Sequence, residues 1–297
     1  MSATMHTPRS TLHMWINNGI TLLNSAADTL IEWPDSKQCA INSAEFRGMS
    51  EINGAIGAVD CSHIAILPRE DERMAYTNRK CFYSVHLLAV VDARGRFTFV
   101  DVGCAGSMAD TTVLRSSILA SEQVQMVRMQ QSPPIPFGYF LLADAGFATM
   151  PWVVQNYTDV QCTASVGCRK FNHCIARGRG IVERAYGQLK MRFKRLGGRT
   201  SYDRKEQVVR YVRACCALHN LNINMEAELF NVSRVQRSAE VLQPVAGAAA
   251  LQFAHTVPSD GAYIGSDKNM RLAGQAVRRL IANDALAARG YDLEAEY

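Results

Sequence analysis

Strand-like runs follow one another in the first half of the chain, and their order limits the possible fold more than any other feature. Each run is short, apolar, partly β-branched and bounded by Gly, Pro or polar residues. They cover 55–67, 81–91, 96–102 and, later, 139–144. A tight turn at 92–95 joins the second and third runs as a hairpin. The fourth run follows a helical pattern at about 109–120. Hairpin strands together with a strand reached through a helix predict a mixed sheet.

Helical patterns surround these runs. Apolar residues recur at helical spacing in four segments, which are 9–33, 177–196, 203–225 and 270–289. The weaker patterns predict a polar connector with a short helical patch at 35–53, a loop at 121–137, a short helix at 149–156 and an irregular stretch at 158–176. A mixed sheet flanked by helices is an α/β domain. We expect an N-terminal helical segment at 1–50, the α/β domain at 51–225 and a helical tail at 226–297.

The sequence shows no sign of a membrane or secretory protein. It has no run of eighteen apolar residues, and its first ten residues lack the apolar core of a secretory signal. The nine cysteines are odd in number and scattered, which indicates reduced thiols rather than a disulfide framework. These observations favour the cytosol or the nucleus.

The positive charge of the chain is concentrated in one segment. Residues 169–199 contain ten lysines and arginines and one acid, Glu183, whereas the whole chain has a net charge of +5. A solvated helix face usually mixes both signs of charge. The imbalance therefore favours a polyanionic partner, such as nucleic acid, over a plain solvent-exposed face.

Acidic residues stand alone at the ends of two strand-like runs. Asp60 follows the apolar residues AIGAV, and Asp144 follows YFLLA. Strand ends are where ligand sites gather in open α/β sheets. Glu183 lies on a predicted helix, in a row with Lys190 and Lys194 that flanks an apolar stripe. The stripe consists of Val182, Ala185, Leu189, Phe193 and Leu196. If the stripe packs on the sheet, the row borders the sheet edge, where Glu183 can meet the strand-end acids.

A fourth acid, Asp110, opens the helical pattern after the third run. Its place fits either a charge at a helix N-terminus or a metal ligand, and the sequence does not separate the two. Carboxylates crowded without counter-charge repel one another, and a divalent cation with oxygen ligands removes that cost. Each acid alone fits a capping or ion-pair role. Together, beside a basic segment, the four acids favour binding of Mg²⁺ or Mn²⁺, which can act as a pair on a phosphodiester.

Five motifs in this order resemble those of a known family. GAVDCSHI, NRKCFYS, GSMAD, LLADAGF and VERAYGQLKMRFKRL are similar to the motifs of the PIF/Harbinger transposases and of the nucleases derived from them, over roughly 54–225. The resemblance implies an RNase H-like fold with catalytic acids at Asp60, Asp144 and Glu183. It also implies that Asp110 is an additional metal ligand beside these three. Cys61 stands where the family commonly has Gly, and 9–33 matches only the last part of the family's helix-turn-helix.

The same resemblance implies DNA as the partner. The family's Asn-Arg-Lys motif corresponds to Asn78, Arg79 and Lys80, which we interpret as phosphate contacts, with a structural turn as the alternative. The basic helix adds Arg179, Arg184, Lys190 and Lys194 as candidate DNA contacts. Family members can also form complexes with a Myb-like DNA-binding protein, and transposases commonly act as oligomers. The expected location is the nucleus, with the cytoplasm also open.

The predicted function is that of a divalent-metal-dependent DNA endonuclease, or transposase-derived nuclease, that hydrolyses phosphodiester bonds. The alternative is a domesticated, non-catalytic protein that binds DNA through the same basic groove or nucleates a complex. Other chemistries find less support, because the sequence has no G-x-S-x-G nucleophile elbow and no Gly-rich phosphate loop. A zinc site is disfavoured because adjacent ligands cannot easily bind one ion and because the spacing fits no common module. The residues considered for it are Cys162, Cys168, His173 and Cys174. We interpret His63, His86 and His219 as structural histidines.

Overall fold

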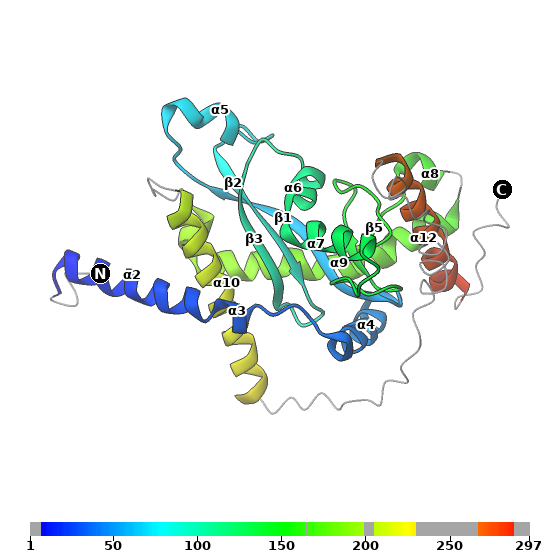
Figure 1. Ribbon diagram of the computed structural model, residues 1–297, viewed down its shortest axis with the longest axis horizontal. Coiled ribbons are helices and arrows are strands. Elements are labelled where there is room, and N and C mark those ends of the chain that lie inside the picture. The colour runs from blue at the N-terminus through cyan, green and yellow to red at the C-terminus, as the bar shows by residue number, and fades with distance from the viewer. Residues whose placement is uncertain (1–6, 164, 199–204, 230–266, 288–297) are drawn as a thin grey trace.

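A five-stranded mixed sheet forms the centre of the computed structural model, which describes residues 7–163, 165–198, 205–229 and 267–287 (Figure 1). The strands are β1 (Ala55–Ala65), β2 (Ser84–Val91), β3 (Phe97–Ala105), β4 (Phe140–Ala143) and β5 (Val153–Gln155). Their spatial order is β3-β2-β1-β4-β5, with β1, β2 and β3 antiparallel and β1, β4 and β5 parallel. This is the predicted α/β fold of the RNase H-like kind.

Helices cover both faces of the sheet. Those before β4 are α2 (Arg9–Ser25), α3 (Ala27–Leu30), α4 (Ser36–Ser50), α5 (Arg73–Tyr76), α6 (Asp110–Ser116) and α7 (Ile118–Arg128). Those after β5 are α8 (Asp159–Thr163), α9 (Val166–Arg192), α10 (Lys205–Leu229) and α12 (Asp267–Ala287), and two 3₁₀ turns lie at Glu70–Glu72 (η1) and Lys194–Gly197 (η2). Among the described residues, no helix combines the length and the apolarity that crossing a membrane requires.

The sheet separates two apolar cores. On one face, α9 and α10 pack against residues such as Ala58 of β1 and Leu142 of β4. On the other face, α6 and α7 pack against Val59 and Leu141, their sequence neighbours. Consecutive side chains of a strand point to opposite faces, so this alternation explains why β4 and the first half of β1 (residues 55–59) are apolar throughout. In the predicted stripe of α9 and η2, Phe193 is partly buried and the other four residues are buried.

The predicted hairpin between β2 and β3 is confirmed. Asp92, which is 0% exposed, closes the turn: its Oδ1 accepts hydrogen bonds from the N–H groups of Arg94 and Arg96, both at 2.9 Å. Its Oδ2 accepts a 2.8 Å bond from Nε of Arg96. Gly95 adopts a φ of +88°, which favours glycine. His219 of α10 donates through Nε2 to the Gly95 carbonyl, so its structural interpretation is also confirmed.

The prediction of an irregular stretch at 158–176 was wrong. Residues 159–163 form α8, and α9 begins at Val166 and continues unbroken to Arg192. The helix was predicted to begin at about residue 177. In the structure Gly178 lies inside the helix, against the sheet. A Cβ at this position would come within 2.4 Å of Leu142 Cδ1, so only glycine fits. This glycine permits close packing of helix on sheet and does not break the helix.

Three further element predictions need correction. The connector at 35–53 contains the full helix α4, whose Asp35 cap accepts a bond from the Gln38 N–H and whose buried face includes polar residues such as Asn42. The helix predicted at 149–156 is replaced by β5, which pairs with β4. The helix at 109–120 is divided at Ser117, which caps α7, and α7 then extends into the predicted loop. Helix α10 ends at Leu229, beyond the predicted 225, and positions 203–204 and 288–289 of the predicted helices lie outside the described residues.

Candidate metal centre

Two neighbouring parallel strands position Asp60 and Asp144. Ala58 of β1 pairs with Leu142 of β4, and the two aspartates lie two residues further along each strand. Strand β4 ends at Ala143, so Asp144 is released from the sheet directly beside β1. The side chain of Asp60 is 17% exposed. Asp144 directly follows β4, as predicted, but the prediction that Asp60 ends its strand was wrong. Strand β1 continues to Ala65 because its second half pairs with β2, and Asp60 lies inside it opposite Ala89. The two acids still come from neighbouring strands.

Asp110 approaches Asp144 from the first turn of α6. The Thr111 hydroxyl donates a 2.9 Å bond to the carbonyl of Gly146, and the Gly146 N–H donates a 2.8 Å bond to Asp144 Oδ1. A Cβ on Gly146 would lie 3.0 Å from Asp144 Oδ1 and 3.1 Å from Asp110 Oδ2. Both carboxylates thus border the same space, which a side chain at 146 would fill. Asp110 makes no capping bond in α6, whose N-cap residue is Ala109.

The environment of Asp60 disfavours its charged form. Burial is the main cause and raises its pKa to about 7, and the negative charges of Asp144 and Asp110 raise it further. The Cys61 N–H, which donates a 2.8 Å bond to Asp60 Oδ1, and the nearby Arg179 act in the opposite direction. Three carboxylates of separate elements therefore interact electrostatically at one end of the sheet.

Glu183 reaches the same region through an arginine. Arg179, one turn earlier on α9, places Nη2 2.6 Å from Glu183 Oε1 and Nη1 3.9 Å from Asp60 Oδ2. The Glu183 side chain is 55% exposed. The hydroxyl of Tyr186, one turn after Glu183, donates a 2.7 Å bond to the backbone carbonyl of Asp60 and fixes α9 against β1. Sequence reasoning missed this tyrosine, although VERAYG places it one helical turn from the glutamate.

The donor set suits a hard divalent cation. Asp60, Asp110 and Asp144 offer carboxylate oxygens from three elements, and Mg²⁺ and Mn²⁺ prefer such ligands. Because burial and the neighbouring acids raise the pKa of Asp60, a nearby cation would favour its charged form. Glu183 can join these acids by exchanging Arg179 for the cation. In the part of the chain that the structure describes, the four acids do not form a group of three or more ligand atoms within 4.8 Å of one another, so their joint role as metal ligands stays a prediction.

The predicted DNA contacts fall into two groups. Arg79, Lys80, Arg184 and Lys194 are exposed, with Lys194 in η2 beyond the end of α9. Three others are engaged within the protein. Asn78 is buried and its side chain organises the turn before β2, accepting bonds from the N–H groups of Lys80 and Phe82. This is the structural-turn alternative for Asn78.

Lys190 and Arg179 are the other two engaged residues. Lys190 Nζ donates 2.7 Å and 3.1 Å bonds to Ser62 Oγ and the His63 carbonyl, so this lysine lies against β1 rather than on the outer flank of the helix. Burial, followed by repulsion from Lys80, lowers its pKa. The pKa of His63 is lowered to about 4, first by burial and then by His86, with Arg79 and both lysines contributing. Positive charges therefore gather around His63, three residues beyond Asp60.

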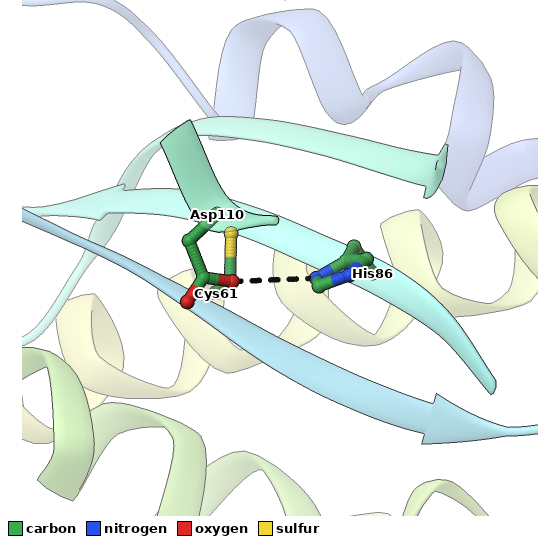
Figure 2. A group of neighbouring side chains, drawn as sticks. All are labelled: Cys61, His86 and Asp110. Carbon is green, nitrogen blue, oxygen red and sulfur yellow. Dashed lines mark ion pairs between the residues drawn. The ribbon is translucent and has the colours of Figure 1, made fainter. Parts of the chain in front are cut away.

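A second group of donors adjoins the carboxylates. Cys61 Sγ, His86 Nδ1 and an Asp110 carboxylate oxygen all lie within 4.8 Å of one another (Figure 2). Burial and the charges of Asp110 and Asp60 raise the pKa of the Cys61 thiol, and burial lowers the pKa of His86. Sequence reasoning missed this group because Cys61 and His86 belong to different strands. In the disfavoured zinc set, by contrast, His173 is exposed while Cys174, its neighbour, is buried.

Comparisons with known proteins agree with this architecture. The family model described as DDE superfamily endonuclease matches residues 59–220. The chain is 27% identical over 236 residues to HARBI1 of Xenopus laevis, named as a candidate nuclease, which covers 78% of this chain and 65% of that protein. HARBI1 of Rattus norvegicus is 30% identical over 70% of this chain and 57% of its own length. An ALP1-like protein of Arabidopsis thaliana is 28% identical over 66% and 49%.

The chain spans about 57–65% of the length of the HARBI1 proteins named above. No solved structure matches it. The family match covers more than half of the chain and includes every acid of the candidate metal centre. The chain therefore belongs to the DDE superfamily endonucleases and is homologous to the Harbinger transposase-derived proteins.

Proposed function

We propose that the chain is a divalent-metal-dependent endonuclease that hydrolyses phosphodiester bonds of DNA. The observation that carries the proposal is the convergence of acids that lie far apart in the sequence. Asp60, Asp110 and Asp144 interact electrostatically at one end of the sheet, and Arg179 links Glu183 to Asp60. A buried, mutually repelling group of carboxylates is costly unless a cation compensates for it.

Asp60, Asp110, Asp144 and Glu183 would hold Mg²⁺ or Mn²⁺, which would supply water activation and charge stabilisation at the phosphorus. The protein's own part is positioning. Tyr186 fixes the backbone of Asp60, and Gly146 holds Asp144 through its N–H while leaving the space between Asp144 and Asp110 open. Arg179 pairs with Glu183 and lies 3.9 Å from Asp60, so it partly offsets the negative charge of both.

DNA would lie across the basic residues beside the acids. Arg79 and Lys80 are exposed and close enough to His63 to lower its pKa. Lys194 and Arg184 extend the exposed positive charge along α9 and η2. A scissile phosphate could then meet the acids while neighbouring phosphates bind these side chains. From the family resemblance we also propose that the protein acts in the nucleus, has a Myb-like partner and self-associates.

Cleavage of plasmid DNA and of labelled duplexes by the purified chain tests the proposal. We expect nicking that requires Mg²⁺ or Mn²⁺, stops with EDTA and is lost in Asp144→Asn. The control is Glu122→Gln, which removes an exposed carboxylate on α7 and should leave cleavage unchanged.

The alternative function gives a different result in the same assay. A non-catalytic DNA-binding protein would retain salt-dependent binding but show no metal-dependent cleavage by the wild type. A protein that only nucleates complexes would show neither. Equal cleavage by the wild type and Asp144→Asn would contradict the assignment of the site.

A further inference from the structure

The side chains of Cys61 and His86 lie on the opposite face of β1 from Asp60, and Asp110 reaches them from α6. His63 and His86 face each other across β1 and β2, and Cys61 is the next residue of β1 on that same face. The side chain of Asp110 approaches from the start of α6 and meets both strands (Figure 2). Sulfur, nitrogen and oxygen donors therefore converge from three elements.

His86 is fixed in the tautomer that a metal requires. Its Nε2 lies 3.1 Å from the Met108 carbonyl, which only accepts hydrogen bonds, so Nε2 carries the proton. The other ring nitrogen, Nδ1, is then an acceptor. The residue is 1% exposed, and Nδ1 is buried and has no hydrogen-bond partner. A histidine whose second nitrogen donates to a backbone carbonyl is typical of metal ligation.

A carboxylate oxygen, which is also an acceptor, lies near Nδ1. Asp110 Oδ1 lies 3.7 Å away, without a hydrogen bond between the two atoms. An unprotonated Nδ1 and a carboxylate oxygen at this distance repel each other unless a proton or a metal ion lies between them. Ligands about 2.0–2.3 Å from a tetrahedral Zn²⁺ are about 3.3–3.8 Å apart, so this separation already fits one ion. All three donor atoms lie within 4.8 Å of one another, so only small side-chain movements would bring them to one ion.

We propose that Cys61, His86 and Asp110 bind a thiophilic divalent transition-metal ion of the Zn²⁺ class. A thiol and an imidazole are ligands that Zn²⁺ takes and Mg²⁺ avoids, which separates this site from the all-oxygen centre. Binding forms a sulfur–metal bond, breaks the S–H bond of Cys61 and releases its proton to solvent. Asp110 is common to both sites, while the inference does not depend on whether the chain cleaves DNA.

Cobalt binding to the purified full chain tests this site directly. Co²⁺ stands in for Zn²⁺ and gives a thiolate-to-metal charge-transfer absorption when a cysteine ligates it. We expect this band in the metal-free wild type kept under a non-thiol reductant, and its removal by an equivalent of Zn²⁺. Cys61→Ser should abolish the band, and His86→Asn should weaken Co²⁺ affinity by about tenfold or more.

Two matched variants complete the test. Cys81→Ser removes an exposed thiol outside the group and should keep the band at full intensity. Asp144→Asn should keep the band while losing cleavage, so the two sites can fail separately. Circular dichroism checks that each variant is folded. The proposal is overturned if the wild type gives no thiolate band, or if the band is undiminished in both Cys61→Ser and His86→Asn.

Discussion

Asp92, which is buried, and Asp60, which is partly buried, lie in contrasting surroundings at the same sheet. Asp92, in the turn between β2 and β3, receives two backbone N–H bonds and one from the side chain of Arg96. Within the described residues, the Asp60 carboxylate receives one hydrogen bond, from the Cys61 N–H, and Arg179 stays 3.9 Å away. Asp92 is neutralised and satisfied, whereas Asp60 faces two further acids and its pKa rises to about 7.

The contrast separates a carboxylate that builds the fold from one that is available for binding. Buried acids persist in proteins when partners offset their desolvation. The turn supplies those partners from its own backbone, so Asp92 needs no ligand. Asp60 has fewer partners, and a hard cation would provide the positive charge that offsets its desolvation.

The largest expected effect is on DNA cleavage, and it distinguishes Asp60 from Asp92. Asp60→Asn should lower metal-dependent DNA cleavage about 10³-fold or more, because a lost metal ligand removes several kcal/mol of transition-state stabilisation. Asp92→Asn should retain near wild-type cleavage per folded molecule. Initial nicking rates measured with both variants decide this, and comparable losses in the two would contradict the division of roles.

The effect on stability should run in the opposite direction. Asp92→Asn removes charge-assisted bonds to the turn and leaves Arg96 without its partner, which should cost about 2–4 kcal/mol in the free energy of unfolding. Asp60→Asn should cost less than about 1 kcal/mol, since it also removes repulsion from Asp144 and Asp110. Urea unfolding in EDTA compares them. A larger loss for the Asp60 variant would show that Asp60 is structural.

A smaller effect concerns the arginine beside Asp60. If Arg179 competes with the metal for Asp60 and Glu183, Arg179→Gln should lower the Mg²⁺ concentration for half-maximal cleavage about two- to fivefold, the range expected for a partly exposed ion pair. Arg177→Gln is the control, because Arg177 lies on the same helix as Arg179 but pairs with Glu51, the residue after α4. An increase in the Mg²⁺ requirement of Arg179→Gln would assign Arg179 to substrate binding instead.

The smallest effect should appear in DNA binding. Replacing Arg79 and Lys80 with alanine should reduce the slope of log affinity against log salt by about 0.9 for each phosphate that the protein no longer neutralises. Arg94→Ala, in the turn that contains Asp92, should leave the slope unchanged because Arg94 pairs with Glu45. Fluorescence anisotropy at several salt concentrations measures both. Equal slopes for all three proteins would remove Arg79 and Lys80 from the interface.

The sequence predicted much of the fold because its elements have local causes. Strands β1, β2 and β4 are apolar runs with clear boundaries, and the 92–95 turn closes through its own residues. Helix α4 was underestimated because its buried face includes the polar residues Asn42, Ser43 and Ser50. Asn42 and Ser43 bond to the backbone at Ile56 and Gly54, outside the helix, and Ser50 donates to the Phe46 carbonyl within it. Strand β5 was missed because three residues become a strand only by pairing with β4.

The candidate site was predictable to a similar extent. The place of Asp144 after β4 follows from local pattern, whereas β1 continues through Asp60 because it pairs with β2. The proximity of the two acids follows from parallel pairing of β1 with β4. The pairing of Arg179 with Glu183, and the turn of Lys190 toward Ser62, depend on how α9 lies on the sheet. The approach of Cys61 to His86 depends on strand register, which a single sequence does not display.

Free energies of unfolding measured with and without Mg²⁺ test most directly whether Asp60 holds a divalent cation. The pKa of Asp60 is about 7 when folded and about 3.9 when unfolded, so its contribution to stability is present below pH 4 and is lost as the pH rises through 7. In EDTA the wild type should therefore lose stability relative to Asp60→Asn between pH 4 and pH 8. At pH 8, Mg²⁺ at about 100 times its Kd should restore about 2.7 kcal/mol to the wild type and nothing to Asp60→Asn. Equal stabilisation of both proteins by Mg²⁺, or of neither, would show that Asp60 is not a ligand of the cation.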